Sequence, residues 1–151
     1  MWQVKQVIAL AMLAICAYTD IKEKCIYIMP LIITGSGSVI ITVTEILVPG
    51  NVDPVHILIT DIVFPILAGA VLVALSCCLK EHLGPGDGYL LAALGLATGI
   101  RVDILSFTVA FVAISLYASF VLLSGKRRYV KSVPMAPFVM SGYVMVLFNE
   151  V

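Results

Sequence analysis

The sequence is dominated by apolar runs long enough to cross a lipid bilayer, and these runs constrain the fold more than any other feature. A spanning helix needs about 20 mostly apolar residues, because the hydrocarbon core of a bilayer is about 30 Å thick. The 151-residue chain is 62% hydrophobic and 12% charged, whereas soluble domains are typically about 45–50% apolar and about 25% charged. The composition therefore predicts an all-α, polytopic membrane protein that forms a single membrane-embedded domain over residues 1–151.

The alternation of apolar and polar segments predicts about six transmembrane helices. They are expected at residues 4–19, 26–48, 55–79, 89–100, 104–123 and 133–148. The fourth helix is short, since its residues extend about 18 Å against about 30 Å of hydrocarbon. The Gly-rich loop before it, residues 84–88, is therefore expected to dip below the membrane surface as irregular backbone in a hydrated notch.

Basic residues are distributed unevenly between the two sides that six spans create. One side carries Lys22, Lys24, Lys80, Lys126, Arg127, Arg128 and Lys131, and the other carries Lys5 and Arg101. Because an excess of Lys and Arg marks cytoplasmic loops, this asymmetry predicts a multi-pass protein of the inner (plasma) membrane with both termini outside. Two acids that are distant in sequence, Asp20 and Asp87, then both lie at the cytoplasmic face.

The pair of acids indicates a chemical function. A carboxylate in or near a bilayer is costly and marks a functional site by default. Two carboxyl groups held close together share one proton, so one can act as general base while the other protonates a carbonyl oxygen. Asp20 and Asp87 are therefore candidate catalytic residues for peptide hydrolysis without a metal or cofactor, and Gly84, Gly86 and Gly88 are candidates for shaping the active-site loop.

Three segments resemble a known family. Gly84-Pro85-Gly86-Asp87 fits the Gly-x-Gly-Asp signature of membrane-embedded aspartic proteases, and the chain more narrowly resembles the type IV prepilin peptidases. Residues 18–22 with Ile26 resemble the family's first catalytic-aspartate segment. Residues 90–95 with Gly99 resemble the helix after the second aspartate, and residues 133–138 resemble a proline-containing motif of the last helix.

The resemblance implies an aspartic endopeptidase that removes short, basic leaders from prepilin-like precursors at the cytoplasmic membrane face. Such precursors include type IV pilins, tight-adherence pilins and pseudopilins. Asp20 and Asp87 would be catalytic, and Pro134 and Pro137 would help to shape the site. The loop with paired Cys-x-x-Cys motifs of bifunctional members is absent, so a short form without methyltransferase activity is expected. Gly88 and Tyr89 stand where many members have an aromatic or branched residue followed by Lys.

Other functions remain open on the sequence alone. A presenilin-like protease shares Gly-x-Gly-Asp but usually has a larger core. A small ion- or proton-coupled transporter could use both acids as a relay, and an inactive assembly or scaffold subunit of a pilus or secretion system could retain the motif. Expected partners are prepilin-like substrates and membrane lipid, and the zero net charge argues against nucleic acid. Gly95-x-x-x-Gly99 is a helix-packing motif that serves either this chain or a homodimer.

Overall fold

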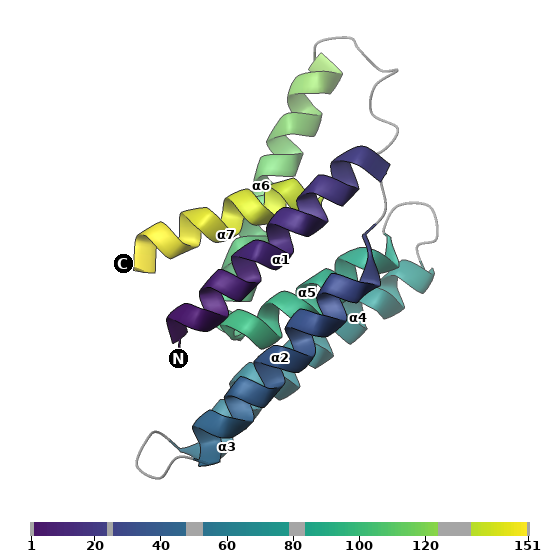
Figure 1. Cartoon of the computed structure of the whole chain (residues 1–151). Helices are drawn as coiled ribbons and strands as arrows, with labels where there is room; N and C mark the ends of the chain where they lie inside the picture. The colour runs from purple at the N-terminus through teal and green to yellow at the C-terminus, as the bar shows by residue number, and fades with distance from the viewer. Residues whose placement is uncertain (1, 24–25, 48–52, 79–83, 124–133, 151) are drawn as a thin grey trace.

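The computed structural model describes residues 2–23, 26–47, 53–78, 84–123 and 134–150, and all the regular elements in these ranges are helical (Figure 1). The α-helices are α1 (Trp2–Glu23), α2 (Ile28–Leu47), α3 (Pro54–Leu58), α4 (Phe64–Cys78), α5 (Pro85–Thr98), α6 (Ile100–Leu123) and α7 (Ala136–Glu150). A π-helical turn, η1 (Ile59–Val63), joins α3 to α4. The all-α prediction is confirmed for the described residues.

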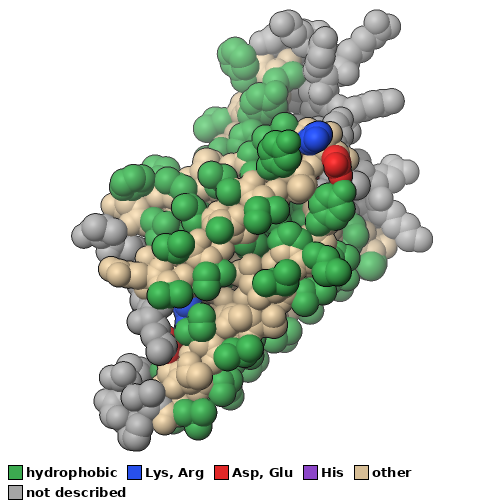
Figure 2. All heavy atoms as spheres, viewed as in Figure 1, with side chains coloured by type: hydrophobic (Ala, Val, Ile, Leu, Met, Phe, Trp, Pro, Cys, Tyr) green, Lys and Arg blue, Asp and Glu red, His purple; other side chains and the backbone are tan. Residues whose placement is uncertain are grey.

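Four helical segments are long and apolar enough to cross a membrane. They are Gln3–Glu23, Ile28–Leu47, Pro54–Cys78 and Ile100–Val121. Helix α5 has 14 residues and α7 has 15, which corresponds to only about 21–23 Å of length. Apolar side chains cover most of the face seen in Figure 2, and the few charged side chains on it lie towards its ends. The structure therefore supports a membrane protein with four candidate spans, and the six-span prediction is not confirmed.

Helix α5 lies at the centre of the described structure. It packs against α4, α2, α6 and α1, while α7 packs against α6 and α1. Leu90 and Leu94 are completely buried, and Leu91 and Ala97 on other faces of α5 are buried as well. A helix that is apolar all round belongs in the interior of a bundle. The residues that follow Asp87 therefore anchor the helix that presents it.

The Gly-rich segment 84–88 is helical from Pro85 onwards, so the expected irregular loop is wrong. Gly84 is the N-cap of α5, and Pro85 takes the first helical position, where its missing N–H costs nothing and its fixed φ suits a helix. Among the described glycines only Gly99 has a positive φ, of 81°. The glycines of this segment therefore do not serve unusual backbone angles.

Close packing between α4 and α5 explains one of these glycines. A Cβ atom on Gly88 would lie 2.6 Å from Val73 Cγ2 and 3.0 Å from the carbonyl oxygen of Gly69. A Cβ on Gly69 would lie 2.5 Å from the Cβ of Ala92. Optimal contacts between carbon atoms are about 3.5–4.0 Å. Only residues without a side chain let these two helices approach so closely, and this accounts for Gly88 immediately after Asp87.

The predicted break between the fourth and fifth spans, at residues 101–103, is also wrong. Helix α5 ends at Thr98, Gly99 turns the chain with its positive φ, and α6 begins at Ile100. Asp103 consequently lies within the first turns of α6 and is completely buried. Several residues behind the predicted charge asymmetry, namely Lys24, Lys80 and 126–131, lie outside the described residues, so the orientation in the membrane stays a prediction.

Candidate active site

Asp20 joins the end of α1 to the beginning of α7. It lies in the last turn of α1 and is only 8% exposed. The backbone N–H of Ala136 donates a hydrogen bond to Asp20 Oδ2 at 3.0 Å. Ala136 is the first residue of α7, and the N–H groups of a first helical turn have no partner within the helix. A carboxylate is favoured at this position because the helix dipole is positive there.

Asp87 lies in the first turn of α5, outside the four candidate spans and before the apolar stretch 89–100. Its backbone N–H donates to the carbonyl oxygen of Gly84 at 3.1 Å. Burial, and to a smaller extent the negative charge of Asp20, raise the pKa of the Asp87 carboxyl from 3.8 to about 6, while a backbone hydrogen bond from Gly84 lowers it. Asp87 is thus an acid that can hold a proton in mildly acidic conditions.

The two predicted acids act on each other in the folded chain. The charge of Asp20 contributes to the raised pKa of Asp87, so the carboxyl groups lie within reach of direct electrostatic interaction. They come from opposite ends of different helices, the carboxyl end of α1 and the amino end of α5. A Cβ on Gly86 would lie 3.2 Å from the Cβ of Ile26, so Ile26, just before α2, also adjoins this site.

The remaining predicted site residues lie around the two acids. Gly84 is exposed as the N-cap of α5, and a Cβ there would lie 3.9 Å from Asp87 Oδ2. Pro134 and Pro137 are half-buried and flank the start of α7 on either side of Ala136. Pro137 falls in the first turn, where a missing N–H is tolerated. The prolines therefore bracket the backbone amide that binds Asp20.

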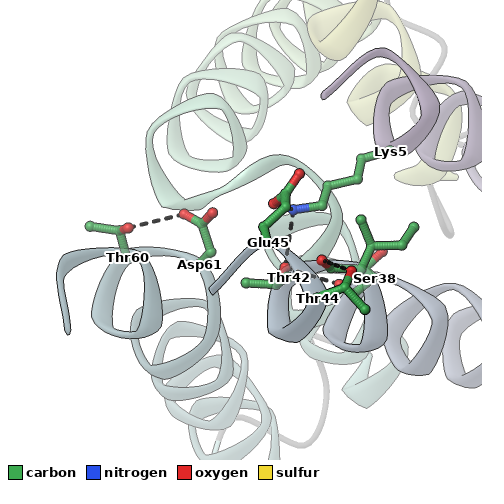
Figure 3. A network of polar contacts seen from close by, with 8 residues as sticks. Lys5, Ser38, Thr42, Thr44, Glu45, Thr60 and Asp61 are labelled. Carbon is green, nitrogen blue, oxygen red and sulfur yellow. Dashed lines mark hydrogen bonds and ion pairs between the residues drawn. The ribbon is translucent and has the colours of Figure 1, made fainter. Parts of the chain in front are cut away.

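A polar cluster that the sequence did not reveal lies at the other end of α1 (Figure 3). Lys5 is buried, and its Nζ lies 2.5 Å from Glu45 Oε2 and 3.1 Å from Thr42 Oγ1, both on α2. Nearby, the Asp61 carboxylate accepts a hydrogen bond from Thr60 Oγ1 at 3.0 Å, and its Oδ1 lies 3.2 Å from where a Cβ on Gly99 would be. Fifteen residues separate Lys5 from Asp20 on the same helix, or about 22 Å, so this cluster is separate from the candidate active site.

Asp103 is the second feature that the sequence did not reveal. Both of its carboxyl oxygens are buried without a hydrogen-bond partner among the described residues. A Cβ on Gly95 would lie 2.7 Å from Asp103 Oδ2, so the absence of a side chain at Gly95 makes room for this acid. The signal in the sequence was Gly95 itself, which was interpreted as a helix-packing residue.

Within the described residues, no group of three or more His, Cys, Asp or Glu side chains could hold a metal ion. Asp20 and Asp87 themselves contribute two carboxyl groups. Comparison of the chain with protein-family models, curated proteins and solved structures gives no match.

Proposed function

We propose that this chain is a membrane aspartic endopeptidase of the prepilin peptidase type, which removes the leader peptide of prepilin-like precursors. Its active site would be the pair formed by Asp20 and Asp87, at the cytoplasmic face of the inner membrane. Its precursors would be type IV pilins, tight-adherence pilins or pseudopilins that serve pilus assembly or protein secretion. The observation that carries the proposal is the packing of α1 against α5, which brings Asp20 at the carboxyl end of α1 near Asp87 at the amino end of α5.

The surroundings of the two acids support different roles for them. Asp20 accepts the Ala136 N–H at the amino end of α7, an interaction that favours a carboxylate. Asp87 has a pKa raised to about 6, mainly by burial and also by the charge of Asp20, so it can hold a proton to donate in mildly acidic conditions. When two neighbouring carboxyl groups lie in different environments, one of them can act as the general acid and the other as the general base. We therefore assign Asp20 as the base and Asp87 as the acid.

The reaction follows from these roles. Asp20 removes a proton from water, the water oxygen attacks the carbonyl carbon of the peptide, and Asp87 donates its proton to the carbonyl oxygen. The resulting diol collapses when Asp20 passes the proton to the leaving nitrogen and the C–N bond breaks. Asp87 recovers a proton from the diol hydroxyl as the new carboxyl group forms. Both residues return to their starting protonation states, so no cofactor or covalent intermediate is needed.

The direct test is cleavage of a synthetic precursor by the purified chain in lipid nanodiscs, followed by mass spectrometry. Asp20→Asn and Asp87→Asn preserve side-chain size but remove an ionisable group, so each should abolish leader removal. Asp61→Asn is the matched control, because Asp61 lies on η1 and bonds Thr60 instead. Cleavage by either active-site variant at the wild-type rate would refute the proposal. A wild-type chain that cleaves no precursor would favour an inactive scaffold subunit.

One observation favours a second candidate, a small proton-coupled transporter. Asp103 is a buried acid inside the candidate span Ile100–Val121, and its oxygens lack partners among the described residues. Buried acids in membrane segments commonly serve proton relays. Proton uptake into proteoliposomes that is lost in Asp103→Asn and retained in Asp87→Asn would support this candidate over the peptidase.

A further inference from the structure

An open groove of about 530 Å³ runs between α2 and α5. On α2 its lining extends from Ile28 to Ile40, and on α5 it extends from Tyr89 to Leu96. Twelve residues of helix separate the ends of the α2 wall, so the groove is about 18 Å long. This length matches about three turns of another helix lying alongside.

One end of the groove adjoins the candidate active site. Ile28 is the first residue of α2, and Tyr89 follows Asp87 by two residues on α5. The segment before α2 also contacts the α5 terminus, because Ile26 lies against Gly86. The groove therefore leads away from Asp87 along the two helices that begin next to it.

The lining specifies the chemistry of an occupant. It contains no charged side chain and is almost wholly apolar, so a basic peptide has no partner within it. Its walls include small residues, namely Gly35, Ser36, Ala92 and Ala93. Small residues let a second helix approach closely inside a membrane. At its rim, Ile32 is 59% exposed and Ile40 is 65% exposed, so both can contact a neighbouring helix.

We infer that this groove binds the apolar membrane helix of the substrate, with the scissile bond at the end of that helix next to Asp87. The inference rests on the proposed function and adds how the substrate is held. It follows that the leader lies outside the groove, beyond the two acids. It also follows that much of the binding energy comes from the part of the precursor that is retained after cleavage.

A matched pair of variants tests the inference through kinetics. Ser36→Leu adds a side chain to the groove lining. Gly37→Leu adds the same side chain to the next residue, where a Cβ meets no other atom within 4 Å. Loss of one well-buried apolar contact corresponds to about tenfold or more in affinity. Ser36→Leu should therefore raise KM for the synthetic precursor about tenfold with kcat within about twofold, and Gly37→Leu should leave both unchanged. An unchanged KM in Ser36→Leu, while the wild-type chain cleaves, would overturn the inference alone.

Photocrosslinking identifies the occupant directly. A benzoylphenylalanine is placed at Ile32 or Ile40 in the Asp87→Asn chain, and the control position is Val112 on α6, which is 56% exposed. The groove positions should label the apolar segment of the precursor, and Val112 should not. Labelling confined to lipid or to a second copy of the chain would overturn the inference, as would equal labelling from Val112. Absence of cleavage by the wild-type chain would instead overturn the proposed function, and this inference with it.

Discussion

Replacement of Gly88 by alanine is a sharp test of how the structure positions Asp87. The added Cβ would lie 2.6 Å from Val73 Cγ2, 2.9 Å from the Val73 backbone nitrogen and 3.0 Å from the Gly69 carbonyl oxygen. Two of these three atoms belong to the backbone of α4, so a change of rotamer cannot relieve them. Helix α5 must move away from α4 beside Asp87, by roughly the 1 Å by which the closest contact falls short of normal separation.

The expected magnitude follows from this geometry. Overpacking of a tight interface typically costs about 1–3 kcal/mol. Gly37→Ala is the matched control, because a Cβ at Gly37 meets nothing within 4 Å. It should stabilise α2 by up to about 1 kcal/mol through helix propensity alone. The two variants should therefore differ by about 1–4 kcal/mol in the free energy of unfolding. A displacement of about 1 Å can also slow a reaction about 100-fold, so leader removal should fall as well.

Unfolding in detergent, followed by circular dichroism, measures the stability difference, and the precursor assay measures the rate. Val73→Ala in the Gly88→Ala background removes Cγ2 but leaves both backbone contacts, so it should restore only part of the loss. Gly88→Ala with the stability and activity of Gly37→Ala would refute the packing argument. Complete rescue by Val73→Ala would show that side-chain contact alone sets the distance between α4 and α5.

Three further predictions concern the charged groups. The pKa of Asp87 is raised from 3.8 to about 6, so its contribution to stability is present below about pH 3.8 and is lost as pH rises through about 6. Since Asp87 must carry a proton for catalysis, kcat/KM should fall by up to about tenfold per pH unit above pH 6, and a profile that rises with pH would contradict this role. Lys5→Met should destabilise the chain by about 1–3 kcal/mol by leaving Glu45 unpaired, and Lys5→Met with Glu45→Gln should recover part of this in the same unfolding assay. Asp103→Asn should retain leader removal and equal or exceed wild-type stability, because it replaces a buried acid without partners; loss of cleavage would place Asp103 in the mechanism.

The prediction that Asp20 and Asp87 lie at the same face of the membrane depends on topology. An even number of crossings between two polar segments returns the chain to the same face, whatever the details of packing. In the structure α1 packs against α5, and the charge of Asp20 contributes to the raised pKa of Asp87, while the shared membrane face of the two acids stays a prediction. The sequence could not show that the Ala136 N–H binds Asp20. Every residue except proline carries the same backbone N–H donor, so the residue type gives no signal.

The Gly-rich segment was predicted incorrectly because glycine has two uses. Read locally, Gly84, Gly86 and Gly88 are helix breakers that favour a loop. In the folded chain Pro85 starts a helix and Gly88 lets α4 approach, so tertiary packing overrides local propensity. Asp103 falls between the predicted spans 89–100 and 104–123, whereas in the structure it lies within α6. The positive φ of Gly99 makes the turn with a single residue, so the polar residues after it belong to a helix.

The most direct measurement of the central claim is the rate of leader removal by Asp20→Asn, by Asp87→Asn and by the double variant, with one precursor in nanodiscs. Residues that act as one catalytic unit are strongly non-additive, since losing either removes the whole mechanism. The account predicts that each single variant is as slow as the double variant. The contrary result is a double variant whose rate, relative to wild type, equals the product of the relative rates of the two single variants. That result would contradict the account, because the two acids would then act independently.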